Sequence, residues 1–537
     1  MRNFIKKEIE KIVGKADFDV FRSENFGDYS SNVAMVLNKD PENLKNKISN
    51  LKSDFISKIE VAGPGFLNFY LKDEVFIKNI SDILKTKEKY GSNNLLKGQK
   101  IIVEYTDPNP FKEFHIGHLM SNAIGESITR ILEISGAKIK RISYGGDVGL
   151  HVAKAIWGKL QKPEMAWGEA YVYGTSNYEN NKEEIDELNK TIFEKKDKEI
   201  NNLYEQGKEL SITHFQEMFK RLGTRFDKNI WESEVTRDAI DVVKIGLDKK
   251  ILEYSDGAVV FKGEQYGLHT RVFVNSKGIP TYEAKDLGLG IKKYEMFSFD
   301  KSIIVTGNEQ NDYFKVLFKT IDLIKPEIAH KTSHIGHGML RFASGKMSSR
   351  KGNVITAAFL IDNIKTLVFE KIAGRGFDNS EKEKIAEHVS LAAIKYSILK
   401  QSPGNDIIFD LKKSISFEGN SGPYLQYTYV RAMSVLKIAE EKKIKASIDV
   451  KNIEITDVEK ILYRFPEIVE EAQEKCAPNY ICSYLIELAH CFNSYYSKFK
   501  IVSGDAESPY RISLTKAVAI TIKNGLNLLA ISAPEKM

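Results

Sequence analysis

The tetrapeptide His-Ile-Gly-His occurs twice, at His115–His118 and at His334–His337. Histidines three positions apart can share one face of a helical turn, where both imidazoles can donate hydrogen bonds to a phosphate. The first copy follows an apolar run and a turn containing prolines, and it leads into a helical pattern of apolar residues. A helix N-terminus presents unpaired N–H groups and a partial positive charge, and Gly117 leaves the backbone accessible. The first copy therefore predicts a phosphate-binding site.

The second copy lies in a different neighbourhood. The stretch "SHIGHGMLRFASGKMSSRKGN", from Ser333 to Asn353, is rich in glycine and predicts a strand followed by a loop. We therefore expect the recurrence at His334 and His337 to be coincidental. The residue of this stretch that we expect to do chemistry is Lys346.

The elements around the first copy predict a nucleotide-binding fold. "KIIVEY" and "AKIKRISY" are typical of buried parallel strands, and between them lies an amphipathic helix that ends near Gly136. The Gly-rich "GGDVG" follows the second strand, which completes a βαβ unit in outline. We expect a small α+β domain at 1–98, a Rossmann-type α/β domain at 99–375 with a charged helical insertion at about 160–265, and an all-α bundle at 376–537.

Bulk composition restricts the class of protein. The chain has 537 residues, 42% of them hydrophobic and 28% charged, with a formal charge of +6, which is compatible with a nucleic-acid partner. Its three cysteines (Cys476, Cys482 and Cys491) fit neither a disulfide framework nor the spacing of a zinc site. No run approaches the roughly 18 apolar residues of a membrane span. We expect a cytoplasmic protein with no bound metal and no membrane contact.

The first copy and the downstream "KMSSR" together resemble the paired signatures of class I aminoacyl-tRNA synthetases. In that family the two motifs flank the phosphates of ATP, and the lysine loop closes on the departing pyrophosphate. The resemblance implies a catalytic role for His115, His118 and Lys346, and ATP arriving with Mg²⁺. It also implies an ATP site made of His115, Gly117, His118, Gly146, Asp147, Met339, Lys346 and Ser348.

Other stretches narrow the resemblance to the arginyl-tRNA synthetases. They are "VEYTDPNPFKEFHIGHLMS", "GGDVG", "PTYEAKDLG", "GNEQNDYFKVLF", "KMSSRKGN", "SGPYLQYTYVRAMSVL" and the terminal "APEKM". A planar guanidinium with five donors requires carboxylates that accept in fork geometry. The resemblance places Glu104 and Asp286 around the guanidinium. It implies an arginine site made of Glu104, Asp107, Asn109, Tyr282, Asp286 and Gln310.

The sequence departs from the family pattern at two positions. Asp107 stands where many relatives have serine, so that the α-amino group of arginine would be recognised differently. Ser349 replaces the second lysine of the usual KMSKS motif. Relatives that lack this lysine are thought to compensate with one just upstream of the first motif, and Lys112 lies there.

Aromatic residues near the C-terminus predict a surface for unstacked bases. Tyr424, Tyr427 and Arg431 are spaced three and four residues apart, which would place two rings and a cation on one helical face. The resemblance assigns Tyr424, Tyr427, Arg431, Tyr496 and Met537 to an anticodon-binding domain, and Phe66 and Asn68 to a module that contacts the tRNA elbow. It implies a monomer that ligates L-arginine to the 3′ end of its tRNA through an arginyl-adenylate.

Three alternatives remain open at this point. The chain could be a class I synthetase for glutamate, glutamine or cysteine, although cysteine enzymes need zinc ligands and glutamate would be repelled by Glu104 and Asp286. It could be a tRNA-binding paralogue without catalysis, against which His115, His118 and Lys346 argue. A nucleotidylyltransferase outside the synthetases would not need the helical C-terminal third.

Overall fold

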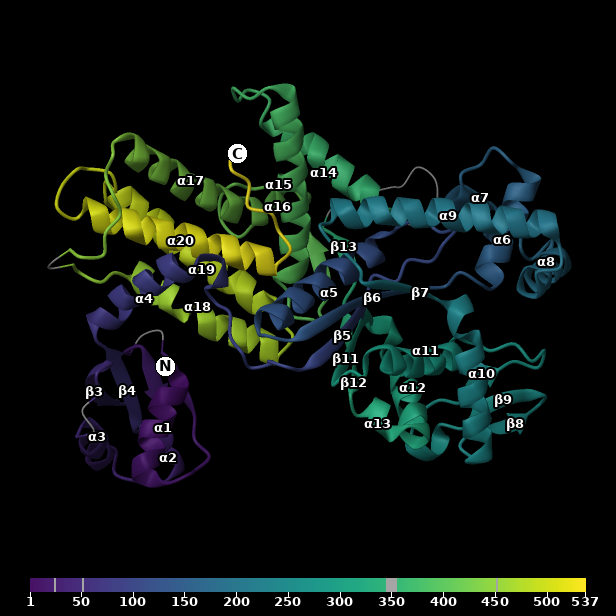
Figure 1. Cartoon of the computed structure of the whole chain (residues 1–537), viewed down its shortest axis with the longest axis horizontal. Helices are drawn as coiled ribbons and strands as arrows, with labels where there is room; N and C mark the ends of the chain where they lie inside the picture. Colours follow the sequence, from purple (N-terminus) through teal and green to yellow (C-terminus); the bar gives the residue numbers. More distant parts are fainter. Residues whose placement is uncertain (24–25, 51–52, 344–354, 451–452) are drawn as a thin grey trace. The chain divides into compact units, whose positions relative to one another are not determined.

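The computed structural model describes residues 1–23, 26–50, 53–343, 355–450 and 453–537, which form two compact units (Figure 1). The smaller unit contains Met1–Lys87, Ile438–Tyr463 and Lys500–Ala517, and the larger contains Glu88–Lys437, Arg464–Phe499 and Val518–Met537. Both units are thus assembled from segments far apart in the sequence. The three-domain division at 98 and 375 stays a prediction.

The smaller unit is built around an antiparallel sheet in the order β1-β2-β4-β3. Ile5 and Ile9 on one face of the first helix are fully buried in the same cluster as Leu67 and Phe69. These four side chains anchor the amphipathic N-terminal helix. The elements are α1 (Arg2–Val13), β1 (Val20–Arg22), β2 (Tyr29–Ser31), α2 (Val33–Val36), α3 (Pro41–Ser49), β3 (Ile56–Ala62), β4 (Phe66–Leu71) and α4 (Asp73–Thr86).

The larger unit contains a five-stranded parallel sheet in the order β12-β11-β5-β6-β7. Its strands are β5 (Lys100–Tyr105), β6 (Lys138–Gly145), β7 (Lys228–Trp231), β11 (Lys301–Gly307) and β12 (Thr332–His337). The chain adds β6 and β7 on one side of β5 and then β11 and β12 on the other. The strand order therefore reverses between β5 and β11, where open α/β sheets bind ligands beyond the strands' carboxyl ends. This topology confirms the predicted Rossmann-type fold.

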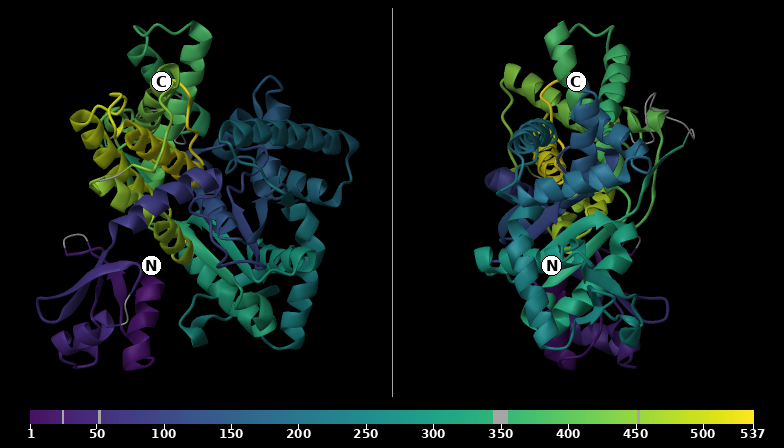
Figure 2. Two further views of the ribbon diagram at one scale, coloured as in Figure 1. Left: turned by 60° about the vertical axis from the view of Figure 1, so that its left-hand side comes forward. Right: turned by 90° about the vertical axis from the view of Figure 1, so that its right-hand side faces the viewer.

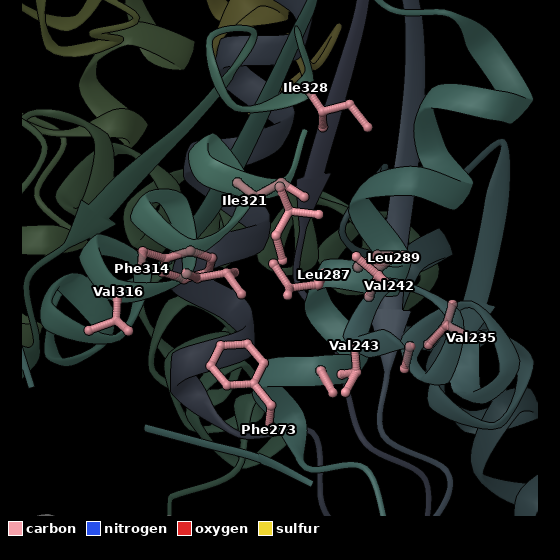
Figure 3. Packing of buried hydrophobic residues seen from close by; sticks show 14 of the residues in the cluster. Val235, Val242, Val243, Phe273, Leu287, Leu289, Phe314, Val316, Ile321 and Ile328 are labelled. Carbon is pink, nitrogen blue, oxygen red and sulfur yellow. The ribbon is translucent and has the colours of Figure 1, made fainter. Parts of the chain in front are cut away.

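Helices cover both faces of this sheet (Figures 1 and 2). One face packs on α5 (Ile116–Ile134), and the other on α10 (Glu232–Asp248), α11 (Tyr282–Phe297) and α12 (Asn311–Ile324). Figure 3 shows the second interface, where Val242, Leu287, Phe314 and Ile321 interdigitate. Both faces are buried, which explains why β5 and β11 read as continuous apolar runs.

The segment from 160 to 265 differs from the expected helical insertion. It does contain long helices, but Lys228–Trp231 forms β7, which pairs with β6 at the edge of the central sheet. The short β8 (Glu253–Ser255) and β9 (Ala258–Phe261) form a separate antiparallel sheet with β10 (Arg271–Val274). Strands of three or four residues carry too little periodicity to be recognised from sequence. The helices of this segment are α7 (Trp167–Ser176), α8 (Lys182–Glu194), α9 (Lys198–Arg221) and α10, and α6 (Leu150–Gln161) leads into it.

The remainder of the described chain is mainly helical. A two-stranded parallel sheet joins β13 (Leu340–Phe342) to β14 (Ile407–Phe409). None of the described helices is long and apolar enough to cross a membrane. The helices are α13 (Pro326–Ala329), α14 (Ala357–Lys371), α15 (Asn379–Leu399), α16 (Leu411–Ser414), α17 (Gly422–Glu441), α18 (Asp457–Glu474), α19 (Asn479–Lys498) and α20 (Ser508–Leu528).

Candidate active site

A cleft of about 530 Å³ lies at the carboxyl ends of β5, β6, β11 and β12. It is the place that the reversal of strand order predicts for a ligand. Ten residues expected from the sequence line it, and they come from the ends of three strands (β5, β6 and β11) and from two helices, α5 and α11 (Tyr282–Phe297). They are Glu104, Asp107, Asn109, His115, Gly117, His118, Gly146, Tyr282, Asp286 and Gln310.

The two histidines of the first copy cap the N-terminus of α5. The imidazole Nδ1 of His115 accepts the backbone N–H of Gly117 at 3.1 Å, and Nδ1 of His118 accepts the backbone N–H of His115 at 3.2 Å. The two rings stack with centroids 3.7 Å apart. A Cβ at position 117 would lie 2.9 Å from the His115 ring, so glycine is required for this ring to fold back over the helix end. Each histidine thus satisfies a helix N–H that would otherwise be unpaired.

This capping fixes the tautomers of both rings. Because each Nδ1 accepts a hydrogen bond, the proton of the neutral imidazole resides on Nε2. Burial lowers the pKa of His115 and, more strongly, that of His118, where the neighbouring His115 and Lys112 act in the same direction. Both rings are therefore neutral donors at pH 7, which suits contacts to a phosphate whose charge grows during transfer.

The loop between β5 and α5 has a strained backbone, and hydrogen bonds to the end of β6 hold it in place. Thr106, Asp107 and Phe111 all have positive φ angles, of 80°, 48° and 69°. Asp107 accepts the backbone N–H of Tyr144 at 2.8 Å, and the side-chain oxygen of Asn109 accepts that of Gly146 at 2.6 Å. Backbone strain at a cleft persists only where surrounding contacts over-determine it, and these two bonds to β6 and the residue after it provide that constraint.

Acidic side chains form the floor of the cleft, and they differ in their partners. Lys293 Nζ lies 2.8 Å from Glu104, both almost fully buried, and Lys285 Nζ lies 2.7 Å from Glu232. Asp286 instead accepts the hydroxyl hydrogen of Tyr313. Three carboxyl groups in the cleft, those of Asp107, Asp286 and Glu309, have no ion-pair partner among the described residues, and of these Asp107 and Asp286 lie beside Glu104.

Asp107 and Asp286 have strongly shifted pKa values. Burial raises the pKa of Asp286 to about 8, against the hydroxyl of Tyr313, and the charge of Glu104 adds to the increase. Burial and the charge of Glu104 also raise the pKa of Asp107 well above its usual range. Both groups are unfavourable as isolated anions, so that a ligand with two cationic groups would stabilise their ionised forms.

The far end of α5 is fixed by its own polar contacts. Arg130 pairs with Glu126 at 2.7 Å and donates to the backbone oxygens of Asn527 and Gly223 at 3.0 and 2.8 Å. The Ser127 hydroxyl donates to the backbone oxygen of Leu528 at 2.8 Å. These bonds join α5 to the ends of α9 and α20, and they hold the helix that presents His115 and His118.

Other predicted ATP-site residues lie elsewhere or cannot be placed. Asp147 does not line the cleft: it is buried and binds Lys208 at 2.6 Å and Ser233. Met339 is 57% exposed and is also absent from the described lining. Lys346 and Ser348 lie outside the described residues. The described chain resumes at Ile355 beside the first copy, where the backbone oxygen of Ile355 accepts from Ile116 and the backbone N–H of Ala357 donates to Phe114.

Lys112 lies close to the histidine pair. Its Nζ is 5.1 Å from the centre of the Tyr171 ring, and its charge contributes to the lowered pKa values of His115 and His118. This location is compatible with a contact to a phosphate, and the role assigned to Lys112 stays a prediction. Within the described ranges, no group of three or more His, Cys, Asp or Glu side chains is arranged to hold a metal ion.

Of the residues predicted to stack on bases, Tyr427, Arg431 and Tyr496 lie together in the structure, and Tyr424 does not join them. The Arg431 guanidinium lies between the rings of Tyr427 and Tyr496, at 4.7 and 5.0 Å from their centres, and donates to Asn493 at 2.6 Å. Tyr424 instead points into the helical core, where its hydroxyl is 3.2 Å from His490.

The remaining predicted tRNA contacts are less accessible. Met537 is buried, and its backbone oxygen accepts from Arg375 at 2.9 Å. In the smaller unit Asn68 is 3% exposed and binds Ser30, while Phe66 is half-buried with its ring against Phe21. Direct contacts of the Asn68 and Met537 side chains with RNA would require a rearrangement.

Several residues in the cleft, and Lys293 behind it in contact with Glu104, were not found from the sequence. Tyr313 lies within a stretch that was noted, and Lys293 lies seven residues after Asp286, on the same helical face. That spacing could have identified Lys293 as a partner for a buried acid. Glu232 is the first residue of α10, and no sequence pattern around it indicated a place in the cleft. His337 also lines the cleft, although the second copy was interpreted as coincidental.

Comparison with known proteins decides the family. Residues 79–411 match the family described as tRNA synthetases class I (R), catalytic domain; residues 425–537 match the DALR anticodon binding domain; residues 1–71 match the arginyl tRNA synthetase N terminal domain. The arginine–tRNA ligase of Clostridium perfringens is 35% identical, over 94% of this chain and 92% of its own length. The chain belongs to the arginyl-tRNA synthetase family.

Further relatives agree with this family. The arginine–tRNA ligase of Fusobacterium nucleatum is 34% identical, over 99% of this chain and 97% of its own. The solved arginyl-tRNA synthetase of Thermus thermophilus superposes with a TM-score of 0.84 over 100% of both chains at 23% identity, which shows the same fold. The match to the catalytic domain family spans the five-stranded sheet and its cleft.

Proposed function

We propose that the chain attaches L-arginine to the 3′ end of its tRNA in an ATP-dependent reaction that releases pyrophosphate and AMP. One observation carries this proposal: Glu104 and Asp286 line the same cleft as the neutral donors His115 and His118. A cleft that combines acidic groups for a cation with donors for a phosphate fits arginine and ATP side by side.

Arginine would be oriented by its two cationic groups. Asp286, with Glu104 beside it, accepts from the guanidinium, and Tyr282 borders that end of the cleft. Asp107 and Asn109 lie on the strained loop, where they would receive the α-ammonium group. Gln310, at the start of α12, would contact the substrate's carboxylate.

The first step needs no general base from the protein. A carboxylate oxygen of arginine attacks the α-phosphorus of ATP, the bond from that phosphorus to the bridging oxygen breaks, and pyrophosphate leaves. The Nε2–H groups of His115 and His118 donate to the phosphate oxygens as their charge increases. Gly146, directly after β6, would border the phosphates of ATP, and Lys346 and Lys112 would neutralise the departing pyrophosphate.

The second step transfers arginine to RNA. The terminal ribose hydroxyl attacks the carbonyl carbon of the adenylate, and AMP leaves with the phosphate oxygen. The cluster formed by Tyr427, Arg431 and Tyr496 would stack unpaired anticodon bases. We further propose that Mg²⁺ enters bound to the phosphates of ATP, and that the protein acts as a monomer in the cytoplasm without zinc.

Amino-acid-dependent exchange of pyrophosphate into ATP tests the proposal. We expect exchange with arginine and tRNA together, and none with glutamate or glutamine. The resemblance implies that tRNA is needed for activation, so arginine alone should not support exchange. Exchange with glutamate would indicate another class I specificity. No exchange under any condition, with tRNA still bound, would indicate a catalytically inactive paralogue.

A further inference from the structure

The two histidines of the second copy have different environments on β12. His334 is half-buried, its ring stacks on Phe314 at 4.1 Å between centroids, and its Nε2 lies 2.8 Å from the Thr306 hydroxyl. His337, the last residue of the strand, is 6% exposed and lines the active-site cleft. Packing thus accounts for His334 and leaves His337 to be explained.

The hydrogen bond of His337 defines what its ring presents to the cleft. Nδ1 lies 2.8 Å from the backbone oxygen of Gly338, and a carbonyl oxygen can only accept, so Nδ1 carries the proton. Burial lowers the pKa of His337, which keeps the ring neutral at pH 7. Nε2 is then a hydrogen-bond acceptor. Among the described residues Nε2 has no hydrogen-bond partner, although the carboxylate of Glu309 is near enough to act on the ring's pKa. Nε2 is also absent from the fully buried polar atoms that lack a partner, so it is accessible to a ligand.

The position of His337 indicates which part of a ligand it meets. β12 is separated from β5 by β11, that is, by two strand spacings or about 10 Å. Glu104 and Asp107, which we assign to arginine, lie at the end of β5 and just after it. A nucleotide whose α-phosphate reacts beside β5 and α5 would therefore extend its nucleoside towards β12.

The chemistry of that acceptor selects a donor on the nucleoside. ATP carries N–H or O–H donors only on its base and its ribose. The ribose hydroxyls would have another acceptor in the cleft, the carboxylate of Glu309, which lies on the turn after β11. His337 lies one strand further out, where the more remote base would be located.

We propose that His337 determines base specificity, its Nε2 accepting a hydrogen bond from the exocyclic amine of adenine. The inference deepens the proposed function and rests on it, since it requires ATP to react in this cleft. It gives the second His-Ile-Gly-His a role distinct from that of the first. The first copy donates to phosphate, and the second accepts from the base.

The test compares ATP with purine riboside 5′-triphosphate, which lacks only the exocyclic amine. We expect arginylation by the wild type to favour ATP by about tenfold in kcat/KM, the effect of one hydrogen bond between neutral groups. In His337→Phe the ratio should fall to near one, because kcat/KM falls with ATP and not with the analogue. His337→Asn, which keeps a side-chain acceptor, should retain part of the preference.

Controls separate this role from packing and from the proposed function itself. His334→Phe, on the same strand but packed on Phe314, should leave the ratio at its wild-type value. A loss in His337→Phe that is equal for both nucleotides, or an unchanged ratio, would overturn the inference. So would a loss of discrimination against 2′-deoxy-ATP only, which would assign His337 to the ribose. If the wild type fails to charge tRNA with arginine and ATP, the proposed function fails instead.

Discussion

At the scale of single residues, each imidazole of the stacked histidine pair has two functions, one for each ring nitrogen. In both His115 and His118 the Nδ1 atom is used by the helix terminus, and Nε2–H is left for the ligand. Replacing His118 by alanine should lower the rate of adenylate formation by about 10²- to 10³-fold, the usual cost of one preorganised donor. The Michaelis constant for arginine should hardly change. Single-turnover measurement of adenylate checks this.

His118→Asn provides the matched control, because the amide restores a donor and should recover part of the rate. The lowered pKa values also mean that neither histidine changes its charge between pH 7 and 8. A rate that rose or fell tenfold in this interval in the wild type, but not in His118→Asn, would contradict neutral donors.

Asp286 should couple arginine binding to pH. Its carboxyl faces Glu104, Glu232, Lys293 and Tyr313, and burial raises its pKa to about 8. A guanidinium favours the ionised form, so binding at pH 7 should release a proton and the dissociation constant should fall as pH rises from 6 to 8. Calorimetry in buffers of different ionisation enthalpy measures this release.

Replacing Asp286 by asparagine should reduce the release by about one proton and weaken binding by about tenfold or more. The same pKa shift determines how the stability of the folded protein changes with pH. The folded pKa lies above the unfolded value of about 3.9, so the free wild type should lose thermal stability as pH rises from 4 to 8. The variant should lack this component. Equal pH dependence of the melting temperature in both proteins would contradict the assignment.

At the scale of elements, α6 and α7 pack through two glycines. A Cβ at Gly174 would lie 2.0 Å from the backbone oxygen of Lys154, and one at Gly158 would lie 2.2 Å from that of Ala170. Gly174→Ala should therefore force the helices apart and lower the melting temperature by several degrees. Hydrogen exchange should increase within residues 150–176.

Gly290 within α11 is the matched control, because the nearest atom to a Cβ there is 3.9 Å away. Gly290→Ala should stabilise the protein by up to about 1 kcal/mol through the higher helix propensity of alanine. If both substitutions had the same effect, close helix contact would not explain Gly174.

At the scale of the whole molecule, the active-site cleft and the proposed RNA-binding surface use different residues. Arg431→Ala should raise the Michaelis constant for tRNA by about tenfold, because one cation and the order it imposes on Tyr427 and Tyr496 are lost. The turnover number at saturating tRNA should remain near wild type. Steady-state arginylation over a range of tRNA concentrations measures both, and a fall in turnover alone would contradict a binding role.

Much of the fold could be predicted from the sequence because the patterns that indicate it are local. The capping histidines, the strand before them and the helix after them lie within about forty residues, and their periodicities predict a βαβ unit directly. The nature of the cleft's acids also followed from the sequence, since Glu104 and Asp286 stand in motifs that resemble a known family.

Tertiary structure alone decided the partners. Lys293 and Tyr313 receive their roles from contacts with Glu104 and Asp286, and the pKa of Asp286 is raised to about 8 because the fold buries its carboxyl group beside Glu104. β7 was missed because a four-residue strand becomes recognisable only when it pairs with β6. His337 reaches the cleft because β12 adds to β11 in parallel, so that strand ends distant in sequence meet at one edge. Pairing and desolvation depend on which segments come together, and a local pattern of residues does not contain that information.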